Sequence, residues 1–169
     1  MKRLVWAATV LLMLGACAFA PTRAIAQDSS VANGWDIRAG LFIPERDASR
    51  SRSGSVWLAF GAERAIWALE QNTATLGVGY YGGDKMYAVP VLVTVNHDKE
   101  RYRLSAGIGF AMQKGISEYS TAFAYKVGAG VNVLRNEALR PLYADLSYRG
   151  TTGASGQLNG FELSLAYTF

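Results

Sequence analysis

The sequence predicts an all-β protein, an up-and-down antiparallel β-barrel of about eight strands. After the first 30 or so residues, apolar and polar residues alternate again and again with a period of two, which is typical of a strand with two different faces. The alternating segments are about 9–13 residues long, the length of a strand that crosses a membrane at a tilt. Glycine and aromatic residues are frequent, with 18 Gly, 9 Tyr and 7 Phe, as expected where a narrow barrel must be filled.

The first four strands are expected at residues 35–43, 55–65, 73–81 and 85–95. The first places Trp, Ile, Ala and Leu on one face and Asp, Arg and Gly on the other. The second and third alternate in the same way, although Trp57 interrupts the polar face of the second. The fourth is apolar on both faces and contains Pro90. Proline has no N–H for the sheet ladder, so we expect a bulge or a local break there.

The last four strands are expected at residues 101–111, 121–133, 140–149 and 158–169. Each sets large apolar residues against charged, small or glycine residues. No segment shows convincing helical periodicity, although residues 62–70 also fit a short turn of helix. The connections 44–54, 82–84, 112–120 and 150–157 would lie at one end of the barrel. The turns 64–72, 96–100 and 134–139 would lie at the other end.

Residues 1–26 have the features of a secretory signal peptide, which leaves 27–169 as one barrel domain. A basic start precedes an apolar stretch, and Ala24 and Ala26 supply the small residues of a cleavage site before Gln27. The apolar stretch is shorter than the ~20 residues of a spanning helix, so a retained anchor is the weaker alternative. Cleavage before Cys17 and acylation of that cysteine is a second alternative, since residues 14–17 resemble a lipobox.

Composition excludes several classes of function. Residues 1–26 hold three of the basic residues and no acid, so their removal lowers the formal net charge from +4 to +1. No basic cluster indicates nucleic-acid binding. The single cysteine, Cys17, lies in the signal peptide, so no disulfide is expected. With one histidine and no other cysteine, neither a metal site nor a cofactor is expected.

The polar face carries the charged residues expected to line the lumen. Because unpaired buried charge is costly, these side chains should pair and fill the interior; a narrow ion or water path is the alternative. A soluble, lipocalin-type barrel would be polar outside instead, but an exposed strand face has no need of so many glycines. The expected network is Asp36, Arg38, Glu63, Lys85, Arg101, Arg103, Lys126, Asp145, Arg149 and Glu162.

The apolar face has its aromatic residues near strand ends. With the N-terminus of the barrel on the periplasmic side, they form two rims, as at two membrane interfaces. The lower rim comprises Trp35, Tyr102, Tyr167 and Phe169, and the upper rim comprises Tyr80, Phe110, Phe123, Tyr148 and Phe161.

The C-terminal segment 161–169 alternates in the same way and ends on Phe169. It resembles the C-terminal signature of bacterial outer-membrane barrels, and residues 27–169 resemble the OmpA/OmpX-like family in pattern and length. The resemblance implies Sec-dependent export and an outer-membrane location in a Gram-negative cell. It also implies recognition of the last strand by the barrel-assembly machinery, and contact with membrane lipid and lipopolysaccharide. We further expect a monomer.

The expected role is structural or interactive rather than enzymatic. Lipid A deacylases, which are barrels of similar size, carry a serine two residues after a histidine, but Lys99 stands two residues after His97. His97 is also expected in a periplasmic turn, away from an outer-leaflet substrate. An unrecognised lipid A-modifying site and a soluble periplasmic ligand-binding barrel are the alternatives. The basic loop 46–52 is expected to be flexible, or else to touch lipopolysaccharide phosphates.

Overall fold

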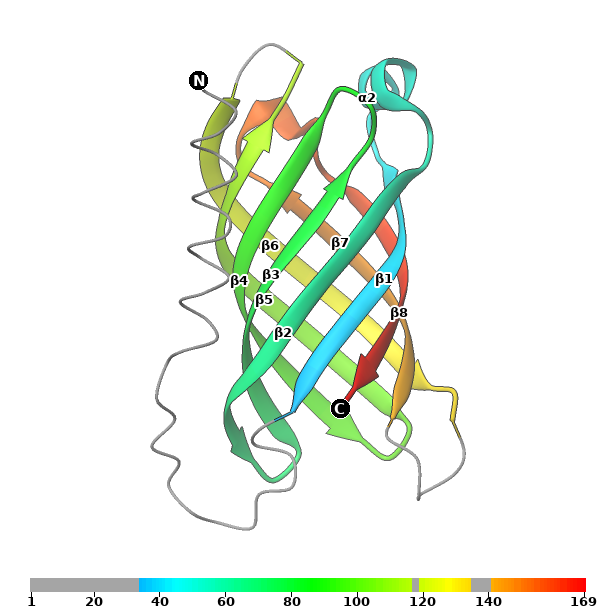
Figure 1. Ribbon diagram of the computed structural model, residues 1–169, viewed down its shortest axis with the longest axis vertical. Coiled ribbons are helices and arrows are strands. Elements are labelled where there is room, and N and C mark those ends of the chain that lie inside the picture. Colours follow the sequence, from blue (N-terminus) through cyan, green and yellow to red (C-terminus); the bar gives the residue numbers. More distant parts are fainter. Residues whose placement is uncertain (1–33, 117–118, 135–140) are drawn as a thin grey trace.

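The computed structural model describes residues 34–116, 119–134 and 141–169. Eight strands form a closed barrel in which each strand pairs antiparallel with its neighbours in the chain and β8 closes on β1 (Figure 1). The predicted fold class is therefore confirmed. The expected signal peptide and Cys17 lie outside the described residues. The strands are β1 (Trp35–Pro44), β2 (Trp57–Leu69), β3 (Asn72–Gly82), β4 (Tyr87–Lys99), β5 (Tyr102–Lys114), β6 (Tyr119–Asn132), β7 (Leu142–Thr151) and β8 (Gly160–Thr168).

The hairpin between β2 and β3 is longer than the sequence indicated. The expected turn at 64–72 is mostly strand, and the alternative helix at 62–70 is wrong, because β2 continues to Leu69. A bulge between Ala65 and Trp67 shifts the β2–β3 register and disturbs the alternation that marks a strand in the sequence. The two strands are joined by Glu70 and Gln71, with Glu70 in the left-handed region at φ 52°, as tight hairpin turns require.

Pro90 produces a local break rather than a bulge. The ladder between β3 and β4 runs to Val78–Val91 and resumes at Tyr81–Ala88 with the register unchanged. On the other side of β4, Pro90 pairs with Ala111 in an uninterrupted ladder. The sheet therefore tolerates proline by losing pairs on one side only, as expected for a residue that lacks an N–H.

The two ends of the barrel differ. Four connections lie at the upper end in Figure 1, which we call the loop end, and they include the long connections β1–β2 (residues 45–56) and β7–β8 (residues 152–159). The opposite, turn end has the tight β2–β3 and β4–β5 turns and the longer β6–β7 connection (residues 133–141). The loop between β1 and β2 is not a free loop as expected, because residues Asp47–Ser53 form the helix α2. Ser49 Oγ donates to the Gln157 carbonyl at 2.6 Å, and Ser53 Oγ accepts from the Lys85 amide at 3.1 Å. These bonds hold α2 against the neighbouring loops. Among the described residues, no helix is long and apolar enough to span a membrane.

Candidate functional site

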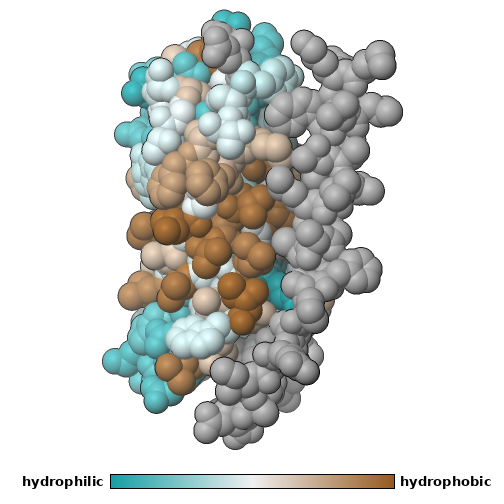
Figure 2. Space-filling view, turned by 90° about the vertical axis from the view of Figure 1, so that its left-hand side faces the viewer, coloured by the Kyte–Doolittle hydropathy of each residue, from teal (hydrophilic) through white to brown (hydrophobic). Residues whose placement is uncertain are grey.

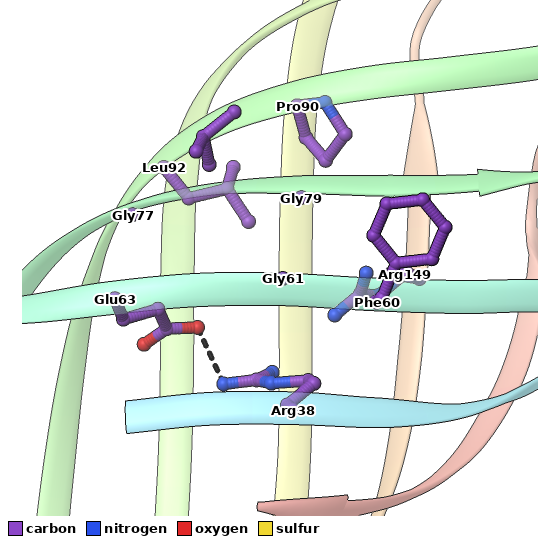
Figure 3. A pocket seen from close by; sticks show the side chains of 10 residues that line it. Arg38, Phe60, Gly61, Glu63, Gly77, Gly79, Pro90, Leu92 and Arg149 are labelled. Carbon is purple, nitrogen blue, oxygen red and sulfur yellow. Dashed lines mark hydrogen bonds and ion pairs between the residues drawn. The ribbon is translucent and has the colours of Figure 1, made fainter. Parts of the chain in front are cut away.

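The barrel interior is the first candidate site, and its centre is a buried cluster of charges. Arg38 of β1 contacts Glu63 of β2 at 2.5 Å, and Lys126 of β6 lies 3.5 Å from the same carboxylate. Thr75 donates to the other Glu63 oxygen at 2.8 Å. Figure 3 shows the Arg38 side chain reaching Glu63 on the neighbouring strand. Because both bases share one carboxylate, Glu63 connects β1 to β6 through the interior.

A second group of ion pairs lies toward the turn end. Arg103 of β5 contacts Asp36 at 3.0 Å and Asp98 at 2.7 Å. Its guanidinium lies 4.0 Å from the centroid of the Tyr143 ring, a favourable cation–π arrangement. Asp98 was not among the expected network residues. The feature that identifies Asp98 as a member of the network is its register position, since it pairs directly with Arg103 in the β4–β5 ladder.

The third group lies toward the loop end. The Arg149 guanidinium of β7 lies 2.9 Å from the Glu162 carboxylate of β8 and stacks over Tyr81 at 5.6 Å. Glu162 is completely buried. Asp145, by contrast, forms no ion pair with a described residue, and its Oδ1 has no hydrogen-bond partner there. Ion pairing is therefore uneven along the interior, and among the described residues of the expected network Asp145 is the acid without an ion pair.

Two of the expected network residues lie elsewhere. Lys85 is exposed in the connection between β3 and β4, and Arg101 is exposed in the turn between β4 and β5. The alternation of the sequence continues past the ends of the strands, since β4 begins at Tyr87 and β5 at Tyr102, and the expectation of a lumen position is therefore wrong for both residues. The other expected members line the interior, with Asp36, Arg38, Glu63, Lys126, Asp145, Arg149 and Glu162 buried and the Arg103 side chain 11% exposed.

Glycines on the neighbouring strands make room for these long side chains. A Cβ at Gly77 would lie 2.9 Å from the Ala62 carbonyl and would also overlap Glu63. A Cβ at Gly130 would overlap Asp145, its partner in the β6–β7 ladder. Two small cavities lie among these side chains, one of about 20 Å³ beside Arg38 and Arg149 and one of about 30 Å³ beside Arg103. Each has room for one or two water molecules.

An apolar plug closes the interior at the loop end. Phe42, Trp57 and Tyr81 pack with ring centroids 5.4 Å (Phe42–Trp57) and 4.5 Å (Phe42–Tyr81) apart. Met86 and Leu158 join them and are 0% exposed. The sequence indicated only that Trp57 broke the polar face of its strand; it did not show that four other residues meet it. The charged part of the lumen therefore extends from the turn end toward the loop end, where the Arg149–Glu162 pair borders the apolar plug.

The outer face of the barrel has the opposite character. Large apolar side chains point outward and are about half exposed, including Leu58, Ile108, Val127, Leu146 and Leu163. On β5 these positions run from Tyr102 to Met112, about 33 Å along the strand at ~3.3 Å per residue, or about 25 Å of height at a tilt of ~40°. Figure 2 shows this apolar band between two hydrophilic ends. A band of that height matches the lipid-facing zone of an outer-membrane barrel.

The expected rim aromatics all lie on the outer face, and three contacts join those of the upper rim to further rings, while a fourth joins two expected members. Phe60 stacks on Tyr80 at 4.9 Å, and Tyr80 on Tyr87 at 6.0 Å. Tyr148 contacts Phe161 at 5.2 Å and Tyr125 at 6.2 Å. At the lower rim, Trp67 is 50% exposed. The sequence did not indicate this position because the bulge in β2 shifts the alternation before Trp67. The remaining expected rim residues are Trp35, Tyr102, Phe110, Phe123, Tyr167 and Phe169.

The described residues contain no group of three or more His, Cys, Asp or Glu side chains placed to hold a metal ion. His97 is at the turn end of β4, where its Nδ1 lies 3.0 Å from Asn72 Oδ1. Asn72 begins β3 next to the hairpin turn. An amide oxygen orients the imidazole, but it does not provide the hydroxyl nucleophile of an acyl-transfer site.

Comparison with known proteins extends the fold assignment. No protein-family model and no curated protein sequence matches this chain. The outer membrane protein Ail of Yersinia pestis matches with a TM-score of 0.55 and 14% identity over 81% of this chain and 99% of Ail. Neisserial surface protein A matches with a TM-score of 0.55 and 12% identity over 83% of this chain and 98% of its own. A designed transmembrane β-barrel matches with a TM-score of 0.56 and 13% identity over 84% of this chain and 100% of the designed chain. The chain thus has the fold of small eight-stranded outer-membrane barrels.

Proposed function

We propose that this chain is a bacterial outer-membrane β-barrel protein with a structural or surface-interaction role and no catalytic activity. The observation that carries the proposal is the sidedness of its wall. Leu146 and Leu163 are more than half exposed on the outside, while Glu162 and Lys126 are nearly inaccessible on the inside. In water this arrangement would expose apolar surface and bury charge, both at a cost; in a lipid bilayer it is the favourable one.

A soluble ligand-binding barrel fits the same residues poorly. Such a barrel binds its ligand in an apolar interior, whereas this interior holds ion pairs and cavities of only about 20 and 30 Å³. The likeness in fold to Ail and to Neisserial surface protein A further supports the membrane alternative. Both arguments support the outer membrane as the location. We further propose that the cell is Gram-negative, that the chain is exported through the Sec pathway and that its signal peptide is removed.

The orientation follows from the two unequal ends. In outer-membrane barrels the longer loops face outside and the short turns face the periplasm, so α2 and the apolar plug lie on the cell-surface side. The plug and the ion pairs occupy the lumen, and general porin activity is not part of the proposal. The protein would act through its loop-end surface and its contacts with lipid and lipopolysaccharide, as a monomer assembled by the barrel-assembly machinery.

A catalytic role is not proposed because His97 lies at the wrong end. Lipid A modification takes place in the outer leaflet, on the loop side, and His97 lies beside the turns.

Heat-modifiability tests the proposal directly. The full chain is expressed in a Gram-negative host, and its outer membranes are analysed by detergent electrophoresis with and without boiling. We expect the protein in this fraction, with a faster-migrating band before boiling, because a closed barrel resists detergent until heated. A known outer-membrane barrel and a periplasmic protein serve as controls. Recovery in the soluble periplasmic fraction with no band shift would overturn the membrane assignment.

A further inference from the structure

A lysine stands between two tyrosines at the upper rim of the barrel. Lys114 of β5 pairs with Tyr87 of β4 on one side and with Tyr119 of β6 on the other. The two rings come from strands that are not neighbours, yet their centroids are only 6.4 Å apart. The Lys114 ammonium lies 5.4 Å from the centroid of the Tyr119 ring. We call these three residues the Tyr–Lys–Tyr triplet.

The height of the triplet on the wall is significant. The apolar band of β5 ends at Met112. Lys114 is the next residue of β5 whose side chain lies on the outer face. On the outer face, the Tyr87 ring stacks on Tyr80, and the Tyr80 ring stacks on Phe60. Tyrosine and lysine placed directly above an apolar band lie at the level of lipid headgroups, with the rings in the interface and the ammonium toward the phosphates.

The chain leaves room for this arrangement at Gly82. A Cβ at Gly82 would lie 2.5 Å from the Tyr87 Cβ and 2.8 Å from the Tyr80 hydroxyl. Gly82 and Tyr87 are paired in the β3–β4 ladder, so any side chain at position 82 would push the rings apart.

The charges around the rim differ from one sector to another. No carboxylate of a described residue forms an ion pair with Lys114, so its charge is not neutralised within the described chain. In the other aromatic sector, the Tyr148 hydroxyl donates to the Glu45 carboxylate at 2.7 Å. A phosphate would be repelled by Glu45 but attracted by Lys114. The complementary ligand of the triplet sector is therefore an anion held at headgroup height.

We propose that the Tyr–Lys–Tyr triplet binds the phosphate group of a lipid in the leaflet at the loop end. The lysine provides the charge, and the two tyrosine rings provide a flat apolar surface for the adjoining part of the headgroup. This inference rests on the proposed function, which makes that leaflet the outer one. It assigns the lysine-mediated phosphate contact to the triplet sector of the wall.

Lipid binding to the detergent-folded protein, measured by native mass spectrometry, tests this site. Phosphatidic acid is the probe, and phosphatidylcholine of the same acyl chains is the zwitterionic comparison, which has no net charge. We expect Lys114→Gln to weaken phosphatidic acid binding about fivefold, the factor for one basic side chain at an anionic surface. Lys114→Arg should preserve it, and so should Lys85→Gln, which removes an exposed lysine in a nearby loop.

The outcomes separate the possible explanations. Equal losses in Lys114→Gln and Lys85→Gln, or no loss in either, would overturn the site. If a large excess of inorganic phosphate displaced the lipid, the triplet would be a site for a free anion, and the proposal that it binds a lipid would be overturned. The gel shift on boiling is recorded for every variant. If the wild-type protein shows no shift, the proposed function fails; if the shift persists while binding ignores position 114, only this inference fails.

Discussion

Arginine at position 163 distinguishes a barrel surrounded by lipid from one surrounded by water. Leu163 lies near the middle of β8, pairs with Leu41 and Leu146 on the neighbouring strands, and is 60% exposed. At the midplane of a bilayer, arginine on the outer face costs about 2–4 kcal/mol of unfolding free energy. On a water-facing surface the same substitution changes stability by no more than about 0.5 kcal/mol. The two environments therefore predict clearly different results.

The assay is equilibrium unfolding by denaturant in phospholipid vesicles, followed by tryptophan fluorescence. Val56→Arg is the matched control, because Val56 is 54% exposed at the loop end, where the cost should fall to about 0–1 kcal/mol. We expect Leu163→Arg to lower the free energy of unfolding by several times as much as Val56→Arg. Equal and small effects of the two variants would refute the argument that the outer face contacts lipid.

Two further predictions concern the interior and use the same unfolding assay. Glu63→Gln should cost about 3–5 kcal/mol, because it leaves Arg38 and Lys126 buried without their shared carboxylate. Asp145→Asn, at the acid with no ion pair, should cost much less, and equal losses would contradict the assigned network. Trp57→Ala should cost about 3–5 kcal/mol by emptying the centre of the plug; a loss below about 1 kcal/mol would show that the plug adds little to stability.

The sequence predicted the strands well where alternation is regular and less well where backbone geometry intervenes. β1 and β8 follow the expected ranges closely because nothing disturbs their period of two. In β2 the bulge beside Ile66 shifts the phase, so the sequence suggested a turn in a place where the strand continues. The ends of β4 and β5 were displaced for a related reason: alternation does not mark where a strand stops, and Lys85 and Arg101 were therefore placed in the lumen.

The helix α2 shows a different limit. Its seven residues are too few to reveal a helical period, and isolated helices of that length are unstable in water. Contacts with other loops hold it instead, through Ser49 and Ser53. No pattern within residues 47–53 could have indicated those partners.

The sequence by itself determined the two faces of the wall, because strand geometry alone sends alternate residues to opposite sides. It thereby separated the apolar exterior from the charged interior. Only the tertiary structure decided which charge meets which, since Glu63 and Lys126 are brought together by the closure and register of the barrel. The same holds for the plug around Trp57 and for Tyr87 and Tyr119 meeting over Lys114. A period of two reports the side of the sheet on which a residue lies, whereas register and closure fix its neighbours across the barrel.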